Sequence, residues 1–134
     1  TLHPLVYAQL LQKKLEKHKS PIFLVNTGWS GSSATSGSSR IDLKLTKHII
    51  KLITDGNLNF SSSVRDKFFN LEIPMNLDGL DNNFLVPHKS WRDLEEYYNT
   101  GNMLTGLFNT NFNKFDIDDK NLINAGPKAQ SGGN

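Results

Sequence analysis

A stretch built only from Ser, Gly, Ala and Thr, residues 30–39, is the feature that most constrains how this chain can fold. It follows a fully apolar run, residues 22–25, which lies between Pro21 and Gly28. A short apolar run with such breakers at both ends predicts a strand buried on both faces, as in a parallel or mixed sheet. The small residues that follow it predict a flexible loop.

Helical periodicity lies on both sides of this loop. The spacing of apolar residues predicts helices over residues 4–18, 43–55 and 90–115, the last of them broken by Gly101 and Gly106. The first of these helices has Pro in its first turn, and the second is followed by Gly56, where a helix C-terminal glycine is common. Ser90, three residues before Asp93, predicts the N-cap of the third helix.

The remaining segments complete an α/β pattern. Residues 68–73 alternate between apolar and polar types up to Pro74 and predict a second strand, and residues 74–89 have the composition of a loop. Residues 126–134 predict a disordered end. The order is helix, strand, loop, helix, strand, helix, so we expect one α/β unit over residues 1–128. Residues 129–134 are expected to be a disordered tail or residues foreign to the natural protein.

Composition limits the function classes. The chain has 134 residues, enough for one domain or a piece of one, and its first residues contain no initiating Met, so we expect it to come from a longer protein. A net charge of +2 predicts no nucleic-acid partner, and no apolar run is long enough to span a membrane. The absence of Cys fits a reducing compartment, so a cytoplasmic location is expected.

The residues on their own form no complete catalytic or metal-binding pattern. The four His have no spacing that would make two of them ligands on one face, and no Cys can assist them. The Ser/Gly stretch lacks the Gly-Lys-Ser/Thr ending of a phosphate loop, and no Gly-x-Ser-x-Gly motif is present. No catalytic residue and no metal ligand is therefore assigned to this chain.

Only the residues around the Ser/Gly stretch suggest a ligand. The end of a strand, a loop of small residues and the start of a helix together form the usual ligand position of α/β folds. Gly28 would let the backbone turn there, and Trp29 is expected to pack into the core. Arg40 stands at the exit of the loop, where it could bind a phosphate, a ribose or a carboxylate. The alternative, a surface Arg beside a flexible loop, is equally compatible with these residues.

Motifs in one order along nearly the whole chain resemble those of a known family. The central block reads Leu24-Val25-Asn26-Thr27-Gly28-Trp29-Ser30-Gly31, followed by Gly37, Arg40-Ile41, Leu43 and Thr46. Before and after it stand His3-Pro4, Tyr7-Ala8, Phe69-Asn70-Leu71, Ile73-Pro74, Trp91, Leu107-Phe108, Lys114-Phe115 and Ala125-Gly126-Pro127. In this order and spacing, the chain resembles the C-terminal part of ATP-dependent phosphoenolpyruvate carboxykinase.

This resemblance implies a fold and a reaction. The fold would be part of the mixed-sheet nucleotide-binding domain. The complete enzyme would convert oxaloacetate and ATP to phosphoenolpyruvate, ADP and carbon dioxide in gluconeogenesis, with Mg and Mn as cofactors. Through the resemblance, Arg40, Ile41 and Thr46 take the roles of ATP contacts on the adenine and ribose side of the site.

The same resemblance implies what this chain lacks. The family's phosphate loop, its metal ligands and the arginines that hold the substrate would lie in a missing N-terminal part, against which this chain would pack. The chain alone is therefore expected to be inactive. Two alternatives from other classes are a free-standing nucleotide-binding or interaction module that has lost the chemistry, and a basic helix (Lys13 to Lys19) that docks on an acidic partner.

Overall fold

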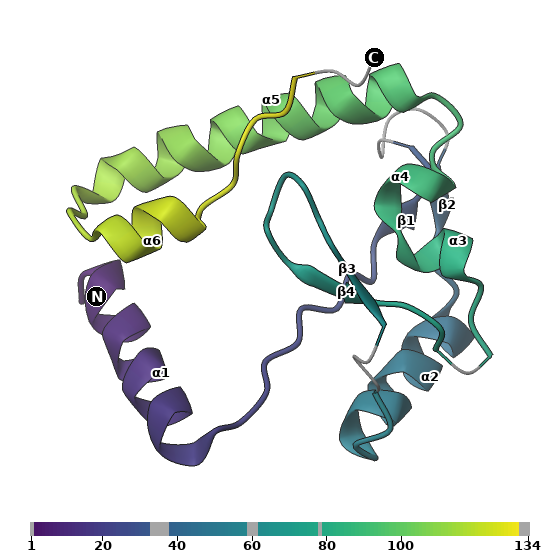
Figure 1. Cartoon of the computed structure of the whole chain (residues 1–134), viewed down its shortest axis with the longest axis horizontal. Helices are drawn as coiled ribbons and strands as arrows, with labels where there is room; N and C mark the ends of the chain where they lie inside the picture. The colour runs from purple at the N-terminus through teal and green to yellow at the C-terminus, as the bar shows by residue number, and fades with distance from the viewer. Residues whose placement is uncertain (1, 33–37, 59–61, 78, 132–134) are drawn as a thin grey trace.

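The computed structural model describes residues 2–32, 38–58, 62–77 and 79–131 as a mixed α/β chain with two small antiparallel sheets. Its elements are α1 (Pro4–His18), β1 (Trp29–Ser30), β2 (Ser39–Arg40), α2 (Leu43–Thr54), β3 (Ser63–Arg65), β4 (Glu72–Pro74), α3 (Asn82–Leu85), α4 (Pro87–Ser90), α5 (Leu94–Phe112), the 3-10 turn η1 (Asn113–Phe115) and α6 (Lys120–Ala125). Figure 1 shows α5 and α6 along one side, α1 at one end and the β3–β4 hairpin between them and α2.

The helix at the N-terminus is confirmed with its predicted bounds. The ring of His3 caps it, because Nδ1 accepts a hydrogen bond from the Leu5 backbone N–H at 3.3 Å. The other ring nitrogen, Nε2, hydrogen-bonds the Phe115 carbonyl oxygen at 2.8 Å. One imidazole thus starts α1 and also ties it to the turn after α5.

The helix predicted over residues 43–55 is also confirmed, as α2. Asp42 is its N-cap, and its Oδ1 accepts a hydrogen bond from the Lys44 backbone N–H at 2.8 Å. Gly56 follows the helix with a φ of +70°, a left-handed conformation that glycine adopts without a steric penalty.

The strand predicted over residues 22–25 is wrong. This segment belongs to no strand, and Ile22 and Leu24 are 58% and 77% exposed. The parallel or mixed sheet is also wrong for the described residues, because β1 pairs only with β2 and β3 only with β4, both antiparallel. A strand needs hydrogen bonds from a neighbour, and neither sheet offers an edge that pairs with residues 22–25.

The strand predicted over residues 68–73 forms only at its end, as β4. Phe68 and Phe69 lie instead in the turn of the β3–β4 hairpin, where Asp66 Oδ1 accepts hydrogen bonds from both of their backbone N–H groups, at 3.0 and 2.7 Å. Such side-chain bonds to the backbone compete with strand pairing. Asn70 completes the turn with a φ of +57°.

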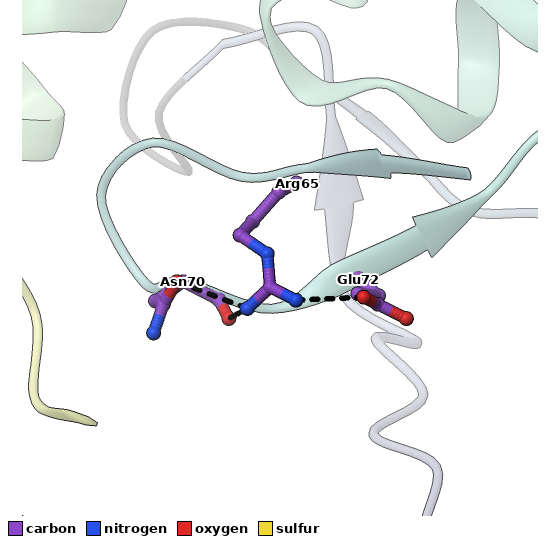
Figure 2. A network of polar contacts seen from close by, with 3 residues as sticks. All are labelled: Arg65, Asn70 and Glu72. Carbon is purple, nitrogen blue, oxygen red and sulfur yellow. Dashed lines mark hydrogen bonds and ion pairs between the residues drawn. The ribbon is translucent and has the colours of Figure 1, made fainter.

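An ion pair closes the same hairpin. Arg65 donates from Nη2 to Glu72 Oε1 at 2.7 Å and from Nη1 to the side chain of Asn70 at 3.1 Å, as Figure 2 shows. Arg65 and Glu72 are opposite each other in the register of the two strands. Both side chains are more than half exposed, so this pair aligns the hairpin more than it stabilises it.

The third predicted helix begins later and is not interrupted. Asp93, not Ser90, is its N-cap, and its Oδ1 accepts from the backbone N–H groups of Glu95 and Glu96. Ser90 ends α4, one of two short helices in the segment predicted to be a loop. Gly101 and Gly106 lie within the continuous α5, since a glycine weakens a helix by only about 1 kcal/mol and does not have to end it.

The small core forms where the hairpin turn meets α5. Phe68 is 2% exposed, and its ring packs on the rings of Tyr97 and Tyr98, with centroids 5.5 and 5.9 Å away. A Cβ on Gly101 would lie 2.5 Å from the Phe68 ring. Glycine is therefore required at this position of α5 to make room for the ring.

The segment after α6 is also held against this core. The Lys128 backbone N–H donates to the Phe68 carbonyl oxygen at 2.8 Å, and Gln130 and Asn102 exchange two hydrogen bonds of 2.8 and 2.9 Å. These bonds place Lys128 and Gln130 against the core, and the disorder predicted for residues 126–134 stays a prediction. Residues 132–134 and residues 33–37 of the Ser/Gly stretch lie outside the described residues, and the boundary at residue 128 stays a prediction.

We predict opposite effects for alanine at the two glycines of α5. Gly101→Ala should lower the free energy of unfolding, because overpacking against Phe68, about 1–3 kcal/mol, exceeds the roughly 1 kcal/mol that Ala gains in a helix. Gly106→Ala meets no atom within 4 Å and should raise it by about 0.5–1 kcal/mol. Urea unfolding followed by circular dichroism measures both. A stabilising Gly101→Ala would contradict the packing described.

We also predict a loss of stability in alkali that depends on Tyr97. Burial, the charge of Asp66 and a hydrogen bond with that carboxylate raise the pKa of Tyr97 from 10.0 to about 12. In the unfolded chain Tyr97 ionises near its ordinary pKa of 10.0, whereas in the folded chain it ionises only near 12. The protonated phenol therefore contributes its full stabilisation of the fold below pH 10, and this contribution is lost as the pH rises to 12. Tyr97→Phe should flatten the fall in melting temperature between pH 9 and 12. The same substitution at the exposed Tyr7 is the control, and an equal slope in the two variants would contradict the prediction.

Candidate functional site

The candidate site is built on the β1–β2 hairpin, which closes the Ser/Gly stretch. Asn26 Oδ1 accepts a hydrogen bond from the Gly28 backbone N–H at 2.9 Å and fixes the turn into β1. The Ile41 backbone N–H donates to the Gly28 carbonyl oxygen at 2.9 Å. Directly after Gly28, Trp29 is paired with Arg40 and Ser30 with Ser39. Trp29 and Arg40, the residues directly before and after the Ser/Gly stretch, therefore lie side by side.

Trp29 contacts Arg40 across the hairpin. The guanidinium carbon of Arg40 lies 5.6 Å from the centroid of the indole ring, within the range of a cation–π interaction. Trp29 is 48% exposed, so the expectation that it packs into the core is wrong. Arg40 is exposed and forms no ion pair with any carboxylate in the described part of the chain. Its guanidinium group is therefore accessible to a ligand.

The other two predicted residues follow at the start of α2. Asp42 caps the helix, and its carbonyl oxygen accepts hydrogen bonds from the Thr46 backbone N–H at 3.0 Å and from Thr46 Oγ1 at 3.3 Å. Arg40, Ile41 and Thr46 thus lie on one continuous strand-to-helix junction, with Ile41 and Thr46 half-buried. The Thr46 hydroxyl donates its hydrogen bond to the Asp42 carbonyl oxygen, and the hydroxyl oxygen can still accept another.

At two glycines this part of the chain lies close to distant segments. A Cβ on Gly31, which has a φ of +90°, would lie 3.1 Å from the Ser90 carbonyl oxygen at the end of α4. A Cβ on Gly79 would lie 3.4 Å from Nε2 of His48 in α2. Sequence patterns did not identify these contacts, because they join segments more than 30 residues apart.

A second polar cluster belongs to the core. A cavity of about 90 Å³ is lined by residues that include Asp66, Phe68, His88 and Tyr97. With the pKa of Tyr97 raised to about 12, its phenol stays protonated at neutral pH and acts as a hydrogen-bond donor to Asp66. The cluster has no nucleophile next to a base and is too small for a metabolite.

Metal ligands do not converge in the described ranges, where no three His, Asp or Glu side chains form a group that could hold an ion. The helices of these ranges are likewise all too short or too polar to cross a bilayer. Among the described residues, the β2–α2 junction brings together a cation that forms no ion pair, a backbone carbonyl and a hydroxyl oxygen.

Almost the whole chain is similar to known proteins. Residues 1–83 match the phosphoenolpyruvate carboxykinase family. Phosphoenolpyruvate carboxykinase (ATP) of Sulfurimonas denitrificans is 38% identical over 132 residues, which are 97% of this chain and 25% of that protein. The proteins of the same name from Caldanaerobacter subterraneus and Emericella nidulans are 39% and 38% identical, over 95% and 96% of this chain and 24% and 22% of their own lengths.

The likeness covers almost all of this chain but a limited part of each relative. The chain spans about a quarter of the length of the curated relatives that it matches. The motifs around the β1–β2 hairpin and α2 fall within the matched residues 1–83. The chain belongs to the ATP-dependent phosphoenolpyruvate carboxykinase family.

Proposed function

We propose that this chain is the C-terminal part of an enzyme that converts oxaloacetate and ATP to phosphoenolpyruvate, ADP and carbon dioxide. Within that enzyme it would supply the adenine and ribose side of the ATP site. The observation that carries the proposal is the junction between β2 and α2, where Arg40, Ile41 and Thr46 lie together and the Arg40 guanidinium has no carboxylate partner among the described residues.

Each of the three residues has one group left for the nucleotide. The Arg40 fork can donate to oxygen atoms of the ribose or of a phosphate. The Ile41 N–H is used by Gly28, so its carbonyl is the backbone group that can accept from the amino group of adenine. The Thr46 oxygen can accept a further hydrogen bond, because its proton is directed to Asp42. A cation and two acceptors match the edge of a nucleoside.

The rest of the chemistry is assigned to the part of the enzyme outside this chain. Phosphoryl transfer requires that donor, metal and acceptor be positioned together. The described residues do not fit Mg or Mn, since they contain no converging group of ligands. The metal ligands, the phosphate loop and the residues that hold oxaloacetate would therefore come from the remaining three quarters of the protein.

Exposed apolar side chains favour this arrangement over a free-standing module. Large hydrophobic residues are exposed on α1, on the segment 22–25 and on α5, among them Leu10, Leu24 and Leu107. Exposed apolar side chains of this size, where they lie together, mark surfaces that pack against another body. We assign them to contacts with the N-terminal part of the same protein.

Arg40→Ala in the complete enzyme should raise the KM for ATP and leave the KM for oxaloacetate unchanged. A lost charge-assisted hydrogen bond costs about 1.5–3 kcal/mol, which corresponds to a roughly 10- to 100-fold rise in the KM for ATP. Steady-state kinetics with each substrate varied in turn measures the effect. The matched control is Lys51→Ala, which removes a cation paired with Asp55 at the other end of α2 and should change neither constant. An unchanged KM for ATP in the Arg40 variant would contradict the assignment.

The isolated chain should show no turnover in a coupled carboxykinase assay, because the groups that position metal and phosphate are not in it. Calorimetry with ATP on a chain shown to be folded by circular dichroism tests whether the junction is preformed. Turnover above the blank would contradict the division of the active site proposed above.

A further inference from the structure

We infer that Trp29 is the positioning residue for Arg40, so that the arginine is held in place before the nucleotide arrives. This inference rests on the proposed function, because it assumes that Arg40 contacts ATP. Trp29 would not need to touch the nucleotide itself. Its indole would hold the guanidinium over the ring face and reduce the number of rotamers that Arg40 loses on binding.

The backbone of the hairpin brings the two side chains together. The Ile41 N–H donates to the Gly28 carbonyl, so residues 28 and 41 take the hydrogen-bonded position of the ladder. In an antiparallel ladder the pair types alternate, so the neighbouring pair, Trp29 and Arg40, is of the non-hydrogen-bonded type. Side chains in that type of pair stand closest to each other. The 5.6 Å separation of guanidinium and indole follows from this register.

The position of the indole is in turn fixed by the hairpin. Asn26 accepts a hydrogen bond in the turn before β1, and Gly31 directly after β1 lies so close to the Ser90 carbonyl oxygen that a Cβ there would be 3.1 Å from it. No carboxylate of the described residues forms an ion pair with Arg40, so the indole is the contact that restrains its charged end. Without the ring, a long exposed side chain would sample many rotamers.

The expected change in the KM for ATP follows from the strength of cation–π contacts. A cation–π contact at an exposed site shifts an equilibrium by roughly two- to five-fold. Removal of the ring should therefore raise the KM for ATP two- to five-fold, a smaller effect than removal of Arg40 itself. Because Trp29 would act through Arg40, its effect should vanish when Arg40 is already absent.

A double-mutant cycle in the complete enzyme tests this inference. The variants are Trp29→Leu, Arg40→Ala and the two combined, with Trp29→Met as a second non-aromatic variant and Trp29→Phe as the conservative one. We expect Trp29→Leu and Trp29→Met to raise the KM for ATP two- to five-fold with kcat and the KM for oxaloacetate unchanged. Trp29→Phe should restore most of the affinity, since it keeps an aromatic face. The combined variant should match Arg40→Ala alone.

The other outcomes separate the two proposals. Effects that multiply in the combined variant would mean that Trp29 binds the nucleotide independently, and would overturn its positioning role. A KM for ATP that rises in Arg40→Ala but not in Trp29→Leu or Trp29→Met would overturn the role of Trp29 and leave the proposed ATP site standing. An unchanged KM in Arg40→Ala would overturn both. A fall in kcat and melting temperature shared by all Trp29 variants would show a merely structural role.

Discussion

The packing of Phe68 against Gly101 is the central contact of the described residues. The ring leaves no room for a Cβ on α5, and the Phe68 carbonyl also accepts the hydrogen bond that holds the segment after α6. One residue thus joins the β3–β4 hairpin, the longest helix and the C-terminal segment. The aromatic rings of Tyr97 and Tyr98 surround it and bury it almost completely. Few other side chains of the described residues are buried to this degree, so the loss of this packing has little to compensate it.

Aspartate residues start the local elements around this contact. Asp42, Asp66, Asp93 and Asp119 each accept a hydrogen bond from a backbone N–H two residues later, at the start of α2, in the hairpin turn and at the starts of α5 and α6. A carboxylate satisfies the free N–H groups of a first turn and interacts favourably with the helix dipole. At α2 this cap follows directly on Ile41, so the same aspartate that begins the helix sets the geometry of the proposed nucleotide site.

The candidate site could be located from the sequence, but its internal contacts could not. Local patterns place Arg40 at the exit of a loop of small residues and before a helix, and the family resemblance adds Ile41 and Thr46 as expected ATP contacts. The contact between Arg40 and Trp29 depends on the register in which the two ends of the loop pair. The equal distances of Trp29 and Arg40 from the ends of the Ser/Gly stretch are the one sequence signal that could have indicated it. The approach of Gly31 to Ser90 has no local signal at all.

By itself, the sequence determined the elements whose hydrogen bonds are internal. Helices α1 and α2 follow from apolar spacing and end residues, because a helix pairs each backbone group with one four residues away. Tertiary structure decided the rest. Residues 22–25 are apolar enough for a strand, yet they form none without a neighbour, since the bonds of a sheet come from another segment. Gly101 should weaken a helix, yet it is the residue that lets α5 pack on Phe68. Local propensity is a small free energy, and burial of an aromatic ring exceeds it.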